Sequence, residues 1–220
     1  MRLRRKPWID EAILHFRSFL YLDPPEGMAG KWKDEFSCPD FPLHVELGTG
    51  KGRFITSMAE NNRQINFMGI ERQRGVIYYA GKKISESLPP LTNVKLLVMD
   101  VQQLSLVFAP GEVSCFYINF CDPWPKARHA KRRLTCHSYL KIYAALLSAG
   151  GCLCLKTDNR DLFDFSMAEL RDEHWILSQI TYDLHASPAE GDVMTEYEAK
   201  FSQKGNRICR LVAKPPFSEK

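Results

Sequence analysis

The sequence predicts an α/β fold, a mostly parallel sheet with helices on both faces. From about residue 43 the chain alternates short apolar runs with longer segments of helical period, and this alternation is the pattern of such a sheet. The 220 residues, 45% of them hydrophobic, can bury the core of one domain. We therefore expect an N-terminal extension over residues 1–42, packed on a single domain over residues 43–220.

Seven short apolar runs bounded by turn residues are candidate strands. The first five are residues 43–47, 66–71, 94–99, 113–119 and 152–157. The last two, whose patterns are less regular, are residues 176–184 and 208–213.

Two stripes of apolar residues at helical spacing predict helices with one face in the core. They comprise Tyr139, Ile142, Tyr143, Leu146 and Leu147, and then Leu162, Phe163, Ser166, Met167 and Leu170. Gly150 and Gly151 follow the first stripe and predict a C-terminal helix cap that leads into the next strand. Residues 184–206 are too long for a hairpin turn, so we expect a functional loop or a short helix there.

The seven cysteines predict neither a zinc site nor a disulfide framework, because their number is odd and no CxxC pair occurs. Cys152 and Cys154 alternate with Leu153 and Leu155, as small apolar residues on one face of a buried strand do. Thiols without disulfide partners are typical of a reducing compartment. We therefore expect no bound metal.

The charge and hydropathy of the chain indicate where it works. A net charge of +4 permits a nucleic-acid partner without identifying one. No stretch approaches the ~20 apolar residues that span a bilayer, and no signal-peptide pattern follows the first basic residues. We expect a cytoplasmic protein outside the membrane, and the sequence leaves open whether it is a monomer or a homodimer.

A glycine-rich turn follows the first predicted strand. Gly48, Gly50 and Gly52 stand in the segment ELGTGKG, before a helix expected to begin near Arg53. Glycine lets the backbone turn tightly and approach a nucleotide-like ligand closely. The GxGxG spacing differs from the GxGxxG pattern of dinucleotide-binding proteins. The turn alone is weak evidence for any cofactor.

Four acidic residues at the ends of successive strands favour one cofactor over others. Glu46, Glu71, Asp100 and Asp122 each lie where a strand ends, and open parallel sheets bind ligands at that edge. Glu71 is placed to accept hydrogen bonds from ribose hydroxyls, and Asp100 from an adenine amine. A carboxylate at Glu46 would repel a pyrophosphate but attract the ammonium and sulfonium of S-adenosylmethionine. Each acid alone has another reading, as a turn residue or helix cap.

The segment NFCDPWPK after the fourth strand predicts a stiff loop, because two prolines hold its backbone out of a helix. Such a loop, carrying Asp122, Trp124 and Lys126, suits a base-binding site. In the alternative reading, Trp124 only packs on the core. Five cations follow within eight residues, and like charges packed this closely favour contact with a polyanion over a merely solvated face. They are Lys126, Arg128, Lys131, Arg132 and Arg133.

Taken together, ELGTGKG, GIE, NFCDPWPK, HAKRR, KTDN and TEYE resemble the motifs of the bacterial tRNA (guanine-N7)-methyltransferase family. The resemblance implies a seven-stranded Rossmann-like class I methyltransferase fold. It also implies transfer of a methyl group from S-adenosylmethionine to guanine N7 in the tRNA variable loop, at tRNA position 46. Asp122 would be the catalytic residue. The residues implied to bind the cofactor are Glu46, Gly48, Glu71, Asp100 and Asp122.

The same resemblance implies which residues hold the substrate guanosine: Lys126, Asp158, Thr195, Glu196, Tyr197 and Glu198. With tRNA as the polyanion, the charge pattern of the basic run predicts that Arg128, Lys131, Arg132 and Arg133 contact the tRNA backbone. Cys121 stands where the family typically has proline. Two structural readings stay open, since Asp158 is also placed to cap a helix starting near Arg160, and Thr195 with Glu198 has the form of a capping box.

The site is expected to act mainly by aligning the guanine with the methyl group. No proton transfer is required, because guanine N7 carries a lone pair and no proton. A carboxylate near the base would stabilise the positive charge that the ring gains. Three other functions remain open from the residues: an amino-group methyltransferase with a DPPY-like loop, an NAD-dependent dehydrogenase, and an RNA-binding protein with a degenerate cofactor pocket.

Overall fold

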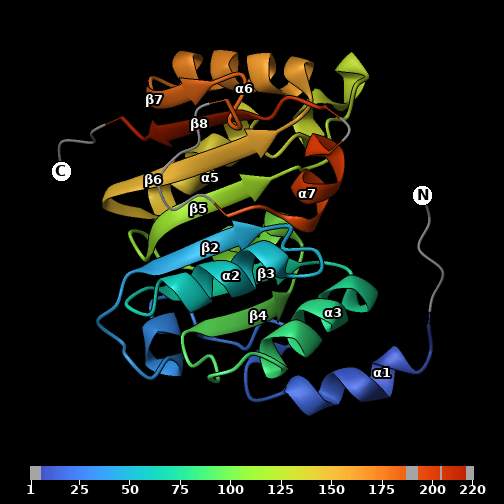
Figure 1. Cartoon of the computed structure of the whole chain (residues 1–220). Helices are drawn as coiled ribbons and strands as arrows, with labels where there is room; N and C mark the ends of the chain where they lie inside the picture. The colour runs from blue at the N-terminus through green and yellow to red at the C-terminus, as the bar shows by residue number, and fades with distance from the viewer. Residues whose placement is uncertain (1–5, 187–192, 204, 217–220) are drawn as a thin grey trace. The chain divides into compact units, whose positions relative to one another are not determined.

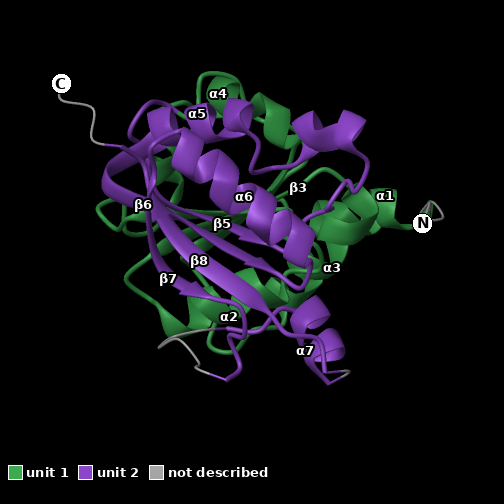
Figure 2. Ribbon diagram, turned by 90° about the horizontal axis from the view of Figure 1, so that it is seen from above, with its two compact units in different colours: residues 1–108 green, residues 109–220 purple. Residues whose placement is uncertain are grey.

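A computed structural model describes residues 6–186, 193–203 and 205–216 of the chain. By their internal contacts the residues form two compact units, residues 1–108 and 109–220, which Figure 2 shows in different colours. Each unit combines a sheet with helices, so the predicted α/β class is confirmed. Part of the predicted loop 184–206 lies outside the described residues, namely 187–192 and 204.

The first unit contains an entirely parallel sheet (Figure 1). Its strand order is β1 (Leu20–Tyr21), β4 (Val94–Val98), β3 (Asn66–Glu71) and β2 (Leu43–Leu47). The bounds of β2 and β3 are those predicted, and β4 is one residue shorter. All three are buried along most of their length, as expected of parallel strands covered on both faces.

Helices of the first unit connect and cover these strands. α2 (Arg53–Asn61) contacts β3 and β4, and α3 (Arg74–Ser85) contacts the same two strands. Near the start of the chain, α1 (Ile9–Ala12) and the 3-10 helix η1 (Ile13–Phe16) pack on α3. The remaining short helices are η2 (Trp32–Glu35), η3 (Val101–Gln103) and α4 (Leu104–Val107).

The N-terminal segment is part of the first unit's core. Trp32 is fully buried, and its indole Nε1 donates a hydrogen bond of 2.8 Å to the carbonyl oxygen of Val107. Strand β1 pairs with β4 and is only two residues long, too short for an alternating pattern to reveal. It brings the described strands to eight, where seven were predicted.

The second unit contains a mixed sheet. Its strand order is β5 (Val113–Asn119), β6 (Leu147–Thr157), β8 (Cys209–Lys214) and β7 (Ile176–Thr181). β5 and β6 run parallel, whereas β8 runs antiparallel to both β6 and β7. The helices α5 (His137–Leu146) and α6 (Arg160–Asp172) contact β6 through the two predicted apolar stripes, whose residues are mostly buried.

Two smaller helices of the second unit lie near its loops. The 3-10 helix η4 (Ala127–Arg132) contains most of the basic run. α7 (Glu196–Ser202) confirms the short helix expected within residues 184–206. None of the described helices is long and apolar enough to cross a membrane.

The predicted helix cap at Gly150 and Gly151 is wrong. α5 ends at Leu146, and β6 begins at the next residue and includes both glycines. The pairing with β5 is irregular there, since Val113 pairs with Leu147 and Cys115 with Cys152. The two glycines therefore lie in a β-bulge, where extra residues in one strand interrupt the regular pairing.

Candidate functional site

The glycine turn of the first unit has the backbone that its sequence predicts. Gly48, Gly50 and Gly52 have φ values of 81°, 60° and 80°, which glycine adopts without strain. A Cβ at Gly52 would lie 2.5 Å from the Cβ of Ala80, so α3 packs directly on the turn. A Cβ at Gly48 would meet no atom within 4 Å. Space for a ligand therefore exists beside Gly48.

Three of the four predicted acids lie at the carboxyl ends of adjacent strands. Glu46 is buried near the end of β2 and accepts a hydrogen bond of 2.5 Å from the hydroxyl of Thr49. Glu71 ends β3, and burial raises the pKa of its carboxyl. Asp100 follows β4 and accepts a hydrogen bond from the backbone of Gln102, capping η3. Because β2, β3 and β4 are parallel neighbours, these carboxylates share one edge of the sheet.

This donor set fits S-adenosylmethionine. Buried or half-buried carboxylates attract a cation and accept hydrogen bonds from hydroxyl groups, and the open side of Gly48 lets backbone approach a ligand. Asp100 already has one cationic neighbour, since the guanidinium Nη1 of Arg72 lies 4.0 Å from its Oδ2. Both side chains are exposed to solvent, so the pair is weak.

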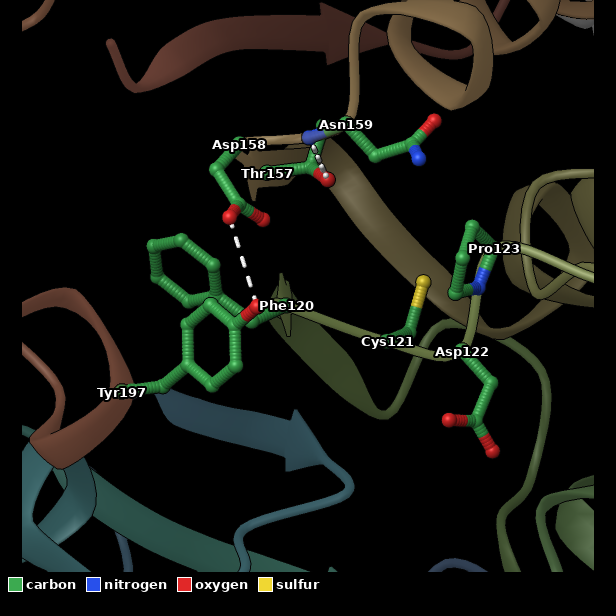
Figure 3. A pocket seen from close by; sticks show the side chains of 8 residues that line it. All are labelled: Phe120, Cys121, Asp122, Pro123, Thr157, Asp158, Asn159 and Tyr197. Carbon is green, nitrogen blue, oxygen red and sulfur yellow. Dashed lines mark hydrogen bonds between the residues drawn. The ribbon is translucent and has the colours of Figure 1, made fainter. Parts of the chain in front are cut away.

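The second unit contains a pocket of about 230 Å³ (Figure 3). It opens where β5 and β6 end and where α7 begins. Of the predicted site residues it brings together Asp122, Asp158 and Tyr197. Its lining comprises Phe120, Cys121, Asp122, Pro123, Thr157, Asp158, Asn159 and Tyr197.

Asp158 faces this pocket and does not cap the following helix. Asn159 is the cap, since its side-chain oxygen accepts a hydrogen bond of 2.8 Å from the backbone of Leu162. The Oδ2 of Asp158 accepts hydrogen bonds from the Tyr197 hydroxyl at 3.3 Å and the Asn206 amide at 3.1 Å. Burial and the same carboxylate raise the pKa of Tyr197. The second oxygen, Oδ1, has no hydrogen-bond partner among the described residues.

Thr195 and Glu198 form the capping box that their spacing suggests. The Thr195 hydroxyl accepts a hydrogen bond from the Glu198 backbone at 2.9 Å, and the Glu198 carboxylate accepts one from the Thr195 backbone at 3.4 Å. Glu198 is fully buried, and its Oε2 lies 3.2 Å from the ammonium of Lys156. Neither Thr195, Glu196 nor Glu198 lines the pocket. The box and the ion pair hold the start of α7, which carries Tyr197.

The loop after β5 is strained and braced. Phe120 and Trp124 have φ values of 51° and 43°, a region that costs a non-glycine residue energy. Arg133 donates hydrogen bonds of 3.0 and 3.1 Å to the carbonyl oxygens of Pro123 and Trp124. The Arg132 guanidinium lies 4.9 Å from the Trp124 ring centre. The basic run therefore stiffens the loop that carries Asp122, together with its prolines.

The members of the basic run differ in exposure. Lys126, Arg128, Lys131 and Arg132 are exposed, whereas Arg133 is half-buried, with its guanidinium 4.2 Å from the ring centre of Phe165. In the part of the chain that the structure describes, no side-chain hydrogen bond or ion pair involves Arg128 or Lys131. These two are the best placed to meet phosphates, whereas Arg133 acts within the fold.

Phe120 and Phe201, which were not predicted as site residues, form one wall beside the pocket together with Tyr197. The ring centres of Phe120 and Tyr197 are 5.0 Å apart, and those of Tyr197 and Phe201 are 4.1 Å apart in a stacked arrangement. The sequence places Phe120 beside a strand end and Phe201 four residues after Tyr197. Only the docking of α7 joins them, so no local pattern identifies the wall.

Cys121 also lines the pocket, and Figure 3 shows its sulfur between the Asp122 and Asp158 sides. Burial, and secondarily the Asp122 carboxylate, raise the pKa of the thiol to about 12. The residue therefore contributes a neutral, apolar surface there. A proline would offer the pocket a similar surface.

Comparison with known proteins identifies the class of this chain. A family described as "putative methyltransferase" matches residues 40–211. Together with the fold, this match makes the chain a methyltransferase. It belongs to the tRNA (guanine-N7)-methyltransferase family. Its relatives include the tRNA (guanine-N(7)-)-methyltransferases of Geobacillus thermodenitrificans, 46% identical over 98% of this chain and 99% of the relative, and of Geobacillus kaustophilus, 48% identical over 98% of each.

Solved structures support the fold. An antibiotic-related methyltransferase superposes with a TM-score of 0.61 at 16% identity, covering 98% of this chain and 97% of the other. The tRNA (m1A58) methyltransferase of Aquifex aeolicus superposes with a TM-score of 0.53 at 12% identity, covering 99% of this chain and 72% of the other. At such low identity the likeness concerns the fold, and it confirms the Rossmann-like methyltransferase fold.

Proposed function

We propose that this protein transfers the methyl group of S-adenosylmethionine to N7 of a guanine in the variable loop of tRNA, at tRNA position 46. The observation that carries the proposal is the pocket in which Asp122, Asp158 and Tyr197 meet, together with the activity named for the relatives. The position within the tRNA rests on the family resemblance.

We assign the cofactor to Glu46, Gly48, Glu71 and Asp100 of the first unit. When bound, S-adenosylmethionine supplies an electrophilic methyl group on its sulfonium. Glu71 and Asp100 provide acceptors for hydroxyl and amine donors, and Glu46 provides negative charge beside the turn. The raised pKa of Glu71 reflects a desolvated carboxyl, which gains most from a hydrogen-bonding ligand.

The guanine is held in the pocket of the second unit. Its N1 and N2 donors match the Oδ1 of Asp158, which accepts no hydrogen bond from the described residues, while Oδ2 accepts from Tyr197 and Asn206. A base also gains from stacking on an aromatic face, and Tyr197 is 41% exposed beside Phe120. Glu198 is a poorer candidate for base contact than Asp158, because it is fully buried and paired with Lys156.

Asp122 is the catalytic residue of this proposal. The neutral ring becomes cationic as N7 gains the methyl group, so a carboxylate beside it stabilises the transition state more than the ground state. No base is needed, because N7 carries no proton. Holding the two reactants in line contributes on the order of 7–11 kcal/mol. Exposed Lys126 is assigned to a nearby phosphate or sugar oxygen.

Product analysis tests the proposed activity. The full chain is incubated with unmodified tRNA and labelled S-adenosylmethionine, and the labelled nucleoside is identified and mapped by digestion. We expect N7-methylguanosine at position 46, and no product in a tRNA with adenine there. N6-methyladenosine, or label in both tRNAs, would contradict the proposal and favour an amino-group methyltransferase or another position.

The exposed cations should supply salt-dependent tRNA affinity. Replacing both Arg128 and Lys131 with alanine is expected to weaken tRNA binding and to lower the slope of log Kd against log salt by about 0.7–0.9 for each phosphate that the variant no longer neutralises. Titrations at several salt concentrations measure the slope. The control replaces Arg171 and Lys214, two exposed cations at other places in the second unit. An unchanged slope in the first variant, or an equal change in the control, would contradict phosphate contact.

We further propose a cytoplasmic location, in keeping with a tRNA substrate. The oligomeric state, monomer or homodimer, stays a prediction.

A further inference from the structure

Three cysteines of the second unit lie together on its sheet. Cys115 is on β5, and Cys152 and Cys154 are on β6. Cys115 and Cys152 are direct partners in the parallel register. The Sγ of Cys115 lies 3.4 Å from that of Cys152 and 3.8 Å from that of Cys154, and all three sulfurs are within 4.8 Å of one another.

The spacing of these sulfurs suits a metal ion at their centre. A point equidistant from all three lies about 2.4 Å or less from each sulfur, and metal–thiolate bonds such as Zn–S are about 2.3 Å long. An ion can therefore bind in the plane of the sulfurs without movement of either strand. The pairing of β5 with β6 itself holds the sulfurs at this spacing.

The cluster lies on the sheet face turned away from α5. Phe116 and Leu153 are register partners on β5 and β6, and the Phe116 ring packs on Tyr143 of α5 at 5.1 Å. Side chains alternate between faces along a strand, so Cys115, Cys152 and Cys154 point to the other side. Cys115 is buried, whereas Cys152 and Cys154 are half-buried. An ion from solvent can reach them.

We propose that Cys115, Cys152 and Cys154 form a three-coordinate thiolate site for a soft monovalent metal ion, Cu(I). Soft thiolate ligands select Cu(I) and zinc among the biological metals, and structural zinc is almost always held by four ligands. Among the residues that the structure describes, no fourth histidine, cysteine, aspartate or glutamate joins the group. This assignment departs from the expectation, drawn from the cysteine spacing, that no metal is bound.

Binding exchanges protons for the metal. Each thiol loses its S–H proton to solvent as its sulfur bonds to the ion, and copper keeps its +1 state, so no oxidant is required. Hydrogen bonds with the neighbouring thiols and burial hold the pKa of Cys115 well above its ordinary value, and Tyr117 beside the cluster also stays protonated, since burial raises its pKa. At Cys154, the hydrogen bond with Cys115 and, to a smaller extent, Arg210 on β8 act to lower the pKa, although the pKa remains raised overall. The Arg210 guanidinium partly offsets the negative charge of the thiolates.

The test is an anaerobic titration of the reduced full-length chain with Cu(I), buffered by a competing chelator. We expect one ion per chain by native mass spectrometry and three Cu–S bonds by X-ray absorption. Serine at Cys115, Cys152 or Cys154 should each weaken binding by at least about 10- to 100-fold, the effect of disturbing even an outer-shell group. The matched control is Cys38→Ser, which removes an exposed thiol outside the cluster.

Circular dichroism on each variant confirms that the fold is kept. Affinity that is unchanged in the triple serine variant would overturn the proposal. So would equal loss in Cys38→Ser, or three-sulfur coordination that persists in Cys154→Ser. Tighter binding of Zn(II) than of Cu(I) in the same buffered competition would overturn the assignment of the ion.

Discussion

Replacing Asp122 with asparagine is expected to lower kcat for methyl transfer to tRNA by about 100- to 1,000-fold, the range found when one preorganised charge-stabilising group is removed from an active site. Asparagine keeps the size of the side chain and one acceptor oxygen, but it replaces the other oxygen with an NH2 donor and removes the negative charge. The charge matters most when the guanine becomes cationic, so kcat should fall far more than tRNA affinity. Single-turnover rates at saturating S-adenosylmethionine measure the effect on chemistry.

Asp161→Asn provides the matched control. Asp161 is an exposed carboxylate in the first turn of α6 that does not line the pocket. Its replacement should leave kcat within about twofold of the parent, since a surface charge at a helix terminus contributes only about 0.3–1 kcal/mol to stability. Near-normal turnover by a folded Asp122→Asn protein would refute the catalytic assignment.

Replacing Glu198 with leucine is expected to lower the free energy of unfolding by about 3–5 kcal/mol, because the buried ammonium of Lys156 would lose the carboxylate that lies 3.2 Å from it. Both side chains of this pair are almost inaccessible to solvent, at 5% and 0% exposure. Lys156 keeps its hydrogen bond of 3.0 Å to the carbonyl oxygen of Val193, which compensates only in part. Urea unfolding followed by circular dichroism measures the decrease in stability.

The double variant Lys156→Met with Glu198→Leu separates charge from packing. It should recover most of the stability, since replacing a whole buried pair with apolar residues is often neutral or stabilising. Asp164→Ala is the control: it breaks the exposed i,i+4 pair with Arg160 on α6 and should cost only about 0.3–0.5 kcal/mol. A double variant as unstable as Glu198→Leu alone would show that the ion pair is not the cause.

Many features that depend on neighbours in the chain were predicted correctly, although the helix cap expected at Gly150 and Gly151 was not. The bounds of β2, β3 and β5 follow from short runs that are mostly apolar, because strands covered on both faces are rich in apolar residues. Glu46, Glu71 and Asp100 were recognised as acids at strand ends, and parallel pairing then places them on one edge. The two helical stripes were also predictable from nearby residues alone, since a helix buries residues that are three and four positions apart.

Features that depend on contacts between distant residues were not predictable. Asp158 and Asn159 are equally able to cap a helix, and the position of α6 selects Asn159. The family motif predicts that Glu198 contacts the substrate, but in the structure α7 packs so that Glu198 is buried beside Lys156. The sequence predicts that Arg133 contacts tRNA, but in the structure its guanidinium donates hydrogen bonds to the loop that carries Asp122.

The methyltransferase class was thus predictable from the residues, and the family from the motifs. The hydrogen-bond and ion-pair partners of each polar side chain could not be predicted from the sequence. These contacts form at about 3 Å, often between segments that are far apart in the chain and are brought together only in the folded structure. The cysteines show this most clearly. In the sequence, Cys152 and Cys154 resemble ordinary small apolar residues of a buried strand. Only the pairing of β5 with β6 shows that the sulfur of Cys115 lies 3.4 Å from that of Cys152.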